Sequence, residues 1–237
     1  MDKFFCFKEK IMNYMFPPTC GFCGKITGSD SFICADCKRI KKQEYINHCR
    51  LCGKVCYSEF CTECRKKKIY YDKFFFCYEY NEDIKDKIHR YKFYGEKYYY
   101  HFFAEMLYER LKEEHADGIV AVPISRERMK ERGYNQCELI AKKLSKMLKI
   151  PYLKGVLVKI KHNERQSLQT LKLRKESVKN VFKVADIYNM IGKKVLLIDD
   201  IFASGSTVNE CSRLLKQAKT KEVKVGVIAV SHMLDRL

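Results

Sequence analysis

The chain has 237 residues, which is enough for one sizeable domain or for one domain with a small module attached. Hydrophobic residues make up 46% of it, so the chain can build a packed core, and wholesale disorder is excluded. Lysine and arginine number 47 against 29 acidic residues, and the net charge of +18 favours polyanionic partners: phosphorylated metabolites, nucleic acid or anionic lipid.

The first twenty residues, "MDKFFCFKEKIMNYMFPPTC", are aromatic, but Lys8, Glu9 and Lys10 interrupt them too early for a secretory signal. We expect them to form a short amphipathic helix that packs either on the protein's own core or on a membrane surface. No uninterrupted apolar run reaches the roughly 18 residues of a membrane span. We therefore expect a cytoplasmic protein, with peripheral attachment at the inner membrane left open, in which the thirteen cysteines do not form disulfides.

Residues 1–68 are predicted to be an N-terminal module held together by zinc. Two cysteines in a C-x-x-C pair can bind one Zn²⁺ at about 2.3 Å, and two pairs complete a closed structural site. The segments "CGFCGK" and "CRLCGK" repeat with an offset of 29 residues, which indicates a duplicated zinc ribbon. Whether neighbouring or interleaved pairs share an ion stays open, and Cys56 is a spare that could replace a ligand. The predicted ligands are Cys20, Cys23, Cys34, Cys37, Cys49, Cys52, Cys61 and Cys64.

Basic runs border these cysteines at residues 37–42, "CKRIKK", and residues 64–68, "CRKKK". Such runs usually form a solvated surface. A zinc ribbon with a lysine rim can also contact nucleic acid, so both interpretations remain.

Residues 69–237 alternate between strand and helix patterns and are predicted to form a second domain. The expected strands are 71–80, 118–125, 156–160, 193–200 and 222–232, and the expected helices are 98–115, 135–149 and 207–219. This alternation predicts an α/β fold with a mainly parallel sheet flanked by helices. Ligands of such sheets bind beyond the carboxyl ends of the strands.

The stretch "GKKVLLIDDIFASGSTVNE" places two acids at such a strand end. Residues 195–198 are apolar enough for a central buried strand, and we expect Asp199 and Asp200 to emerge exposed from it. In the loop that follows, small residues, serine and threonine hydroxyls and a helix N-terminus suit a monophosphate. The acids suit ribose hydroxyls or a Mg²⁺ ion. A ribose 5-phosphate unit would satisfy both features.

Residues 195–207 resemble the signature of type I phosphoribosyltransferases: four apolar residues, two acids, two apolar residues and a small hydroxylic loop with glycine. The resemblance implies that phosphoribosyl pyrophosphate binds with Mg²⁺ and that Asp199 and Asp200 hold the ribose. Phe202 and Ala203 depart from the usual pattern, but Ala203 removes no backbone amide. By the same resemblance, the 5-phosphate is held by Ala203, Ser204, Gly205, Ser206 and Thr207.

Three more segments resemble ComF-type competence proteins, in the order of that family. They are "IHRYKFYG" (88–95), "VPISRERMKERGYNQCELIA" (122–141) and "NERQSLQTLKLRKESVKNVF" (163–182). With the double zinc ribbon, the likeness covers almost the whole chain. It implies a role in DNA uptake during natural transformation, together with partners in the uptake machinery. Ser177 stands where the pattern has asparagine, which puts any role of that amide in doubt.

The basic residues after the strand at 118–125 are candidate pyrophosphate ligands, although a solvated basic loop explains each of them as well. No residue marks an acceptor for phosphoribosyl transfer. A phosphoribosyltransferase with an unknown acceptor and a non-catalytic adaptor that binds single-stranded DNA are therefore both compatible with the sequence. The candidate pyrophosphate ligands are Arg126, Arg128, Lys130, Arg132 and Arg174.

Overall fold

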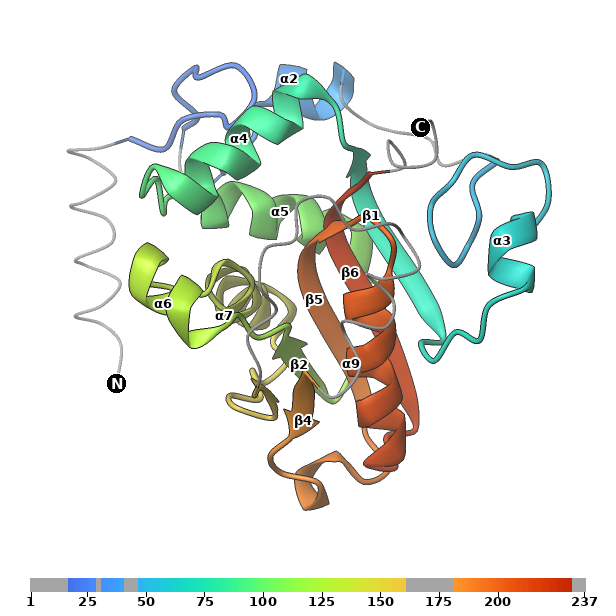
Figure 1. Ribbon diagram of the computed structural model, residues 1–237. Helices are drawn as coiled ribbons and strands as arrows, with labels where there is room; N and C mark the ends of the chain where they lie inside the picture. The colour runs from blue at the N-terminus through green and yellow to red at the C-terminus, as the bar shows by residue number, and fades with distance from the viewer. Residues whose placement is uncertain (1–16, 29–30, 41–46, 161–180, 232–237) are drawn as a thin grey trace.

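A computed structural model describes residues 17–28, 31–40, 47–160 and 181–231. Its centre is a parallel sheet of four strands in the order β1-β6-β5-β2 (Figure 1). This confirms the predicted α/β fold with a mainly parallel sheet. The strands are β1 (Lys73–Glu79), β2 (Gly118–Ala121), β5 (Lys194–Phe202) and β6 (Glu222–Val230).

The two middle strands carry long apolar runs because helices or loops cover both of their faces. Along β5, Val195 and Leu197 enter one core, whereas Leu196 and Ile198 enter the other. The alternation follows from the two-residue period of a strand. The sheet therefore separates two apolar layers, and the end of β5 lies between them.

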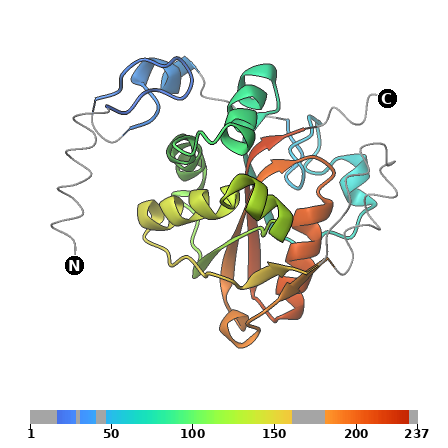
Figure 2. The same ribbon diagram turned by 60° about the vertical axis from the view of Figure 1, so that its left-hand side comes forward.

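Three helices cover one face of the sheet: α4 (Glu82–Phe93), α5 (Tyr99–Leu111) and α7 (Gln136–Leu148) (Figure 2). On α5, which lies within the predicted helix 98–115, Phe103, Leu107 and Leu111 recur every four residues and are fully buried. Helix α4 was not predicted. It begins at Asn81, whose side chain accepts a hydrogen bond from Ile84 N at 3.0 Å.

Residues 126–132 form a helix, α6 (Arg126–Arg132), and the expectation of a loop was wrong. The Ser125 hydroxyl caps its start by accepting from Arg128 N at 3.3 Å, and Gly133 ends it with a φ of 77°. None of its side chains is buried, so it has no apolar stripe that a sequence pattern could reveal. The candidate pyrophosphate ligands of residues 126–132 are therefore carried by a helix and not by a loop.

The other face is covered by α9 (Ser206–Gln217) and by a small antiparallel sheet. That small sheet pairs β3 (Leu157–Lys159) with β4 (Phe182–Val184), and a short 3₁₀ turn, η1 (Tyr188–Met190), follows. The strand predicted at 156–160 exists, but it does not join the main sheet. β4 was not predicted.

The cysteine-rich segment packs on both faces of the sheet near the edge strand β1. Its first half, with α2 (Ala35–Ile40), packs on α5, where the rings of Phe22 and Phe102 are 4.8 Å apart. Its second half, with α3 (Thr62–Arg65), packs on β1, where a Cβ on Gly53 would come within 2.8 Å of the Phe76 ring. Figure 1 shows α2 next to α4 and α3 on the far side of β1.

In the parts of the chain that the structure describes, no helix has the length and apolar character needed to cross a membrane.

Candidate functional site

Asp199 and Asp200 lie inside β5, at the carboxyl end of the sheet. β2 pairs with β5 only as far as Ala121 and Ile198, whereas β6 accompanies β5 to Phe202. The two aspartates are therefore past the end of one neighbouring strand but still within the sheet. They are only 8% and 6% exposed, so the expectation that they emerge exposed was wrong.

Asp200 is held by one cation, one side-chain amide and the backbone N–H of Ile201. Its Oδ2 lies 2.8 Å from Lys92 Nζ, at the end of α4, and accepts from Gln136 Nε2 at 2.7 Å. Burial alone would raise the pKa of Asp200, but Lys92 and Gln136 outweigh it, and the pKa is lowered. Asp200 is thus a carboxylate with its charge compensated.

Asp199 has a different environment. Its Oδ1 accepts from Asp200 N at 2.9 Å and from the Cys137 thiol at 3.4 Å. Burial and the neighbouring charge of Asp200 raise its pKa to about 7. The oxygens of both aspartates and the Cys137 sulfur lie within 4.8 Å of one another. Lys92 thus pairs with Asp200 alone, and two adjacent buried carboxylates with one lysine suit a hard cation or sugar hydroxyls.

A further set of contacts fixes Gln136 at the start of α7. Its side-chain oxygen accepts from Arg132, and its backbone carbonyl accepts from the Tyr91 hydroxyl at 2.9 Å. The Arg132 guanidinium also lies over the Phe93 ring at 5.3 Å. Gln136 therefore connects the acid pair to both α4 and α6.

The loop after β5 leads directly into α9. Gly205 has a φ of 73°, and a Cβ there would come within 2.4 Å of the Phe202 ring, so glycine is required for two reasons. Phe202, one of the departures from the family signature, is buried against Phe74 with ring centroids 4.7 Å apart. The large ring at this position thus closes the core beneath the loop and leaves the loop itself accessible.

The residues of this loop face outward to different degrees. Ala203 is exposed, whereas Ser204, Gly205, Ser206 and Thr207 are half-buried. The Ser204 and Ser206 hydroxyls are 2.9 Å apart. The first N–H groups of a helix have no partner within the helix, and the first turn of α9 contains no acidic side chain. This turn can therefore donate hydrogen bonds to an anion.

The candidate pyrophosphate ligands are only partly brought together. Arg126, Arg128 and Lys130 are exposed on α6, and Arg174 lies outside the described residues. Arg132 turns inward: burial lowers its pKa, although Asp200 opposes that shift. Lys159 of β3, which the sequence did not suggest, is a further half-buried cation, and burial followed by the proximity of Arg128 lowers its pKa.

Lys92 and Gln136 are the functional candidates that sequence reasoning missed. Both lie in segments that carried the family resemblance, "IHRYKFYG" and "RGYNQ". Their contact with the acid pair depends on the packing of α4 and α7 against β5, which neither segment encodes by itself.

The eight predicted cysteine ligands form two clusters, Cys20/Cys23/Cys34/Cys37 and Cys49/Cys52/Cys61/Cys64, each with its sulfurs within 4.8 Å of one another. The Cys23–Cys34 and Cys52–Cys61 sulfur distances are both 3.7 Å. Tetrahedral zinc with bonds of about 2.3 Å requires about 3.8 Å between sulfurs. Neighbouring pairs thus share each cluster, and both clusters fit structural zinc. Cys56 lies outside them and donates to Ser58 O at 2.9 Å.

Comparison with known proteins agrees with this arrangement. A model of the phosphoribosyl transferase domain matches residues 135–235. Competence protein F of Haemophilus influenzae is 31% identical over 206 residues, 83% of this chain and 90% of that protein. Competence protein ComFC of Streptococcus pneumoniae is 30% identical over 201 residues, 84% of this chain and 88% of that protein.

Two more distant matches cover smaller shares of the chain. DNA utilization protein YhgH of Escherichia coli is 30% identical over 109 residues, 46% of this chain and 47% of that protein. Among solved structures, a purine phosphoribosyltransferase from Pyrococcus horikoshii aligns with 56% of this chain and 75% of its own, with 19% identity and a TM-score of 0.39.

Proposed function

The chain belongs to the family of competence protein F and ComFC, and on this basis we propose that it binds phosphoribosyl pyrophosphate with Mg²⁺ and acts in DNA uptake during natural transformation. One observation carries the proposal. Two adjacent buried carboxylates, Asp199 and Asp200, stand directly before an accessible helix N-terminus at the carboxyl end of a parallel sheet. The relatives' names support the role in competence and DNA utilization.

Each part of the donor has a matching set of groups. Asp199 and Asp200 would hold the ribose hydroxyls or the Mg²⁺, and residues 203–207 would hold the 5-phosphate. Arg126, Arg128, Lys130, Arg132 and Arg174 would meet the pyrophosphate. Bound Mg²⁺ would neutralise part of the pyrophosphate charge. If transfer occurs, the cationic side chains steady the leaving pyrophosphate while the protein excludes water from the anomeric carbon.

Titration calorimetry with phosphoribosyl pyrophosphate and Mg²⁺ tests the binding. Wild type should bind, and an Asp199→Asn/Asp200→Asn double variant should lose at least about tenfold in affinity, because hydrogen bonds to charged groups contribute about 1.5–3 kcal/mol. Asp72→Asn, which removes a carboxylate at the opposite end of the sheet, is the matched control. A wild type that does not bind the donor would refute the proposal.

Turnover is a separate question and needs its own assay. We propose a phosphoribosyltransferase activity whose acceptor is to be found by measuring pyrophosphate release over a panel of nucleobases and amines. If phosphoribosyl pyrophosphate binds but no acceptor leads to pyrophosphate release, the protein is better explained as a sensor or a non-catalytic adaptor.

We propose that residues 1–68 form a module that two zinc ions fold onto residues 69–237. The two cysteine clusters and their sulfur spacing support it. Elemental analysis should find two zinc ions per chain, and Cys49→Ser should lower that number, whereas Cys77→Ser, a buried thiol outside both clusters, should not. A chelator should unfold the module, since a structural zinc contributes about 10–16 kcal/mol in small zinc domains. One zinc ion or none would contradict this proposal.

A second candidate function is the handling of single-stranded DNA, and exposed aromatic rings favour it. Phe93, Tyr94 and Tyr98, around the turn between α4 and α5, are 56%, 69% and 49% exposed. Cations and aromatic rings together form the stacking surfaces of proteins that bind single strands. These rings lie next to the basic helix α6 through the contact of Arg132 with Phe93.

Binding of a fluorescent single-stranded oligonucleotide at several salt concentrations tests this candidate. Log K against log salt should fall with a slope of about −0.7 per phosphate contacted. Phe93→Ala/Tyr94→Ala should weaken binding by about 1–3 kcal/mol per stacked base, whereas Tyr188→Ala, an exposed tyrosine of η1, should not. Weak binding without salt dependence would contradict it.

A further inference from the structure

Lys92 occupies one of the two oxygens of Asp200, a residue of the proposed ligand site. It lies in the last turn of α4, is half-buried, and places its Nζ 2.8 Å from Asp200 Oδ2. Gln136 Nε2 donates to the same oxygen at 2.7 Å. Since a carboxylate oxygen has two lone pairs, these two donors satisfy Oδ2 completely. Neither a ribose hydroxyl nor a cation can bind this oxygen while both donors remain.

The two hydrogen-bond donors, Lys92 and Gln136, differ in how firmly the protein holds them. Gln136 is fixed from both sides, because Arg132 holds its side chain and Tyr91 holds its backbone carbonyl. Lys92 extends to the site on four methylenes, one residue before the exposed Phe93 at the end of its helix. The ammonium of Lys92 would also repel an incoming Mg²⁺. Of these two hydrogen-bond donors, Lys92 is therefore the one that is displaced when a ligand binds Asp200.

A neighbouring anion would give the ammonium a new partner. Removing a buried lysine from its carboxylate is costly unless another negative charge replaces it. Phosphoribosyl pyrophosphate brings its pyrophosphate within reach of the same strand end if the ribose lies on Asp199 and Asp200. The same ligand can thus replace Lys92 on the Asp200 carboxylate and offer the Lys92 ammonium its pyrophosphate as a new negative partner.

We propose that Lys92 is a displaceable counter-ion and positioning residue. Without phosphoribosyl pyrophosphate it neutralises Asp200, and it moves to the pyrophosphate group when phosphoribosyl pyrophosphate and Mg²⁺ bind Asp200. This inference rests on the proposed function. It makes Lys92 a competitor of Mg²⁺ alone but a partner of the complete donor.

These opposite effects give the test. Titration calorimetry compares Mg²⁺ alone with Mg²⁺–phosphoribosyl pyrophosphate on wild type, Lys92→Met, Lys92→Arg and Lys87→Met. Lys92→Met should bind Mg²⁺ alone about tenfold more tightly and the complete donor at least about tenfold more weakly, as expected for the loss of one charge-assisted hydrogen bond. Lys92→Arg, which keeps the charge, should recover part of the donor affinity.

Lys87 is the matched control on the same helix. It is buried and, like Lys92, ion-paired, but its partner Asp83 belongs to α4 itself. Lys87→Met should change neither affinity.

The outcomes separate this inference from the function on which it rests. A wild type that binds no donor overturns both. Donor binding that is equal in wild type and Lys92→Met overturns the inference alone. Weaker binding of Mg²⁺ alone as well as of the donor in Lys92→Met would also overturn it, because it would indicate a structural role. Thermal unfolding of each variant verifies that it is folded.

Discussion

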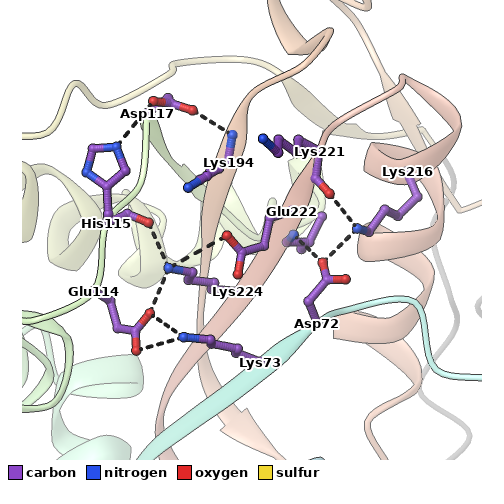
Figure 3. A network of polar contacts seen from close by, with 11 residues as sticks. Asp72, Lys73, Glu114, His115, Asp117, Lys194, Lys216, Lys221, Glu222 and Lys224 are labelled. Carbon is purple, nitrogen blue, oxygen red and sulfur yellow. Dashed lines mark hydrogen bonds and ion pairs between the residues drawn. The ribbon is translucent and has the colours of Figure 1, made fainter.

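At the amino end of the sheet, buried Lys224 of β6 lies 2.7 Å from Glu114 Oε2 and 2.8 Å from the His115 carbonyl, and Lys73 reaches the same carboxylate (Figure 3). Asp72 nearby pairs with Lys216 at 2.7 Å. At the carboxyl end, Lys92 pairs with Asp200, and in the described part of the chain no cation forms an ion pair with Asp199.

The difference separates a structural network from the proposed binding site. At the amino end, Lys73 and Lys224 both form ion pairs with Glu114, so the charges there are compensated without a ligand. At the carboxyl end, Asp199 is left without a cation, and its pKa rises to about 7 because of burial and Asp200. Charges left uncompensated by the protein itself are typical of functional sites, where a ligand completes the balance.

Lys224→Met should have the largest effect on stability and none on ligand binding. Removing one partner of a buried ion pair typically costs about 3–5 kcal/mol, and the remaining Lys73 should keep the loss near about 3 kcal/mol. Urea unfolding in the presence of zinc measures the loss, and calorimetry measures donor binding. A folded Lys224→Met protein that no longer binds the donor would contradict the division between the two ends.

Asp199→Asn should act in the opposite direction. It removes the uncompensated charge and keeps an oxygen for Asp200 N and the Cys137 thiol, so the free energy of unfolding should rise by about 1–2 kcal/mol. Donor affinity should fall by about tenfold or more. The same urea and calorimetry measurements test both effects. If the variant is less stable than wild type, Asp199 is part of a balanced network like that at the amino end.

Low pH should reduce the free energy of unfolding by protonating Glu114 at the amino end of the sheet. Burial alone would raise the pKa of Glu114, but Lys224 and Lys73 outweigh it, and the pKa is lowered from its ordinary 4.5. The stability that this gives is complete above pH 4.5 and is lost as the pH falls through the lowered pKa of the folded state. Glu114→Gln should flatten the fall of the unfolding free energy below pH 4.5. An unchanged pH profile would show that Glu114 does not contribute.

The sequence predicts the sheet and the acid pair because both are local patterns. Apolar runs at 195–198 and 225–230 indicate strands buried on both faces, and the acids and small residues that follow the first run indicate a strand end and a helix start. The cysteine spacing likewise predicts two clusters, since each ligand pair is separated by only two residues.

The rest depends on packing between distant segments. The burial of Asp200 depends on Lys92 and Gln136, which other elements bring to β5. Helix α6 buries no side chain and thus has no periodic stripe to detect, and β4 has only three residues, too few to show a strand period. Lys159 lies in the predicted strand 156–160, but its proximity to Arg128 depends on how the small sheet packs, which the strand pattern does not show.

Lys73→Met should have the smallest single effect of these variants, about 0–1 kcal/mol in the free energy of unfolding. Its ammonium lies 3.1 Å from Glu114 Oε2, but the side chain is 49% exposed, and exposed ion pairs contribute little. In Lys73→Met/Lys224→Met, however, the loss should exceed the sum of the two single losses, because Glu114 would then be partly buried without a cation. Urea unfolding of the four proteins of this double-mutant cycle measures the coupling. Simple additivity would mean that the two lysines do not compensate Glu114 jointly, and the amino end would then resemble the acid pair more closely than the distances indicate.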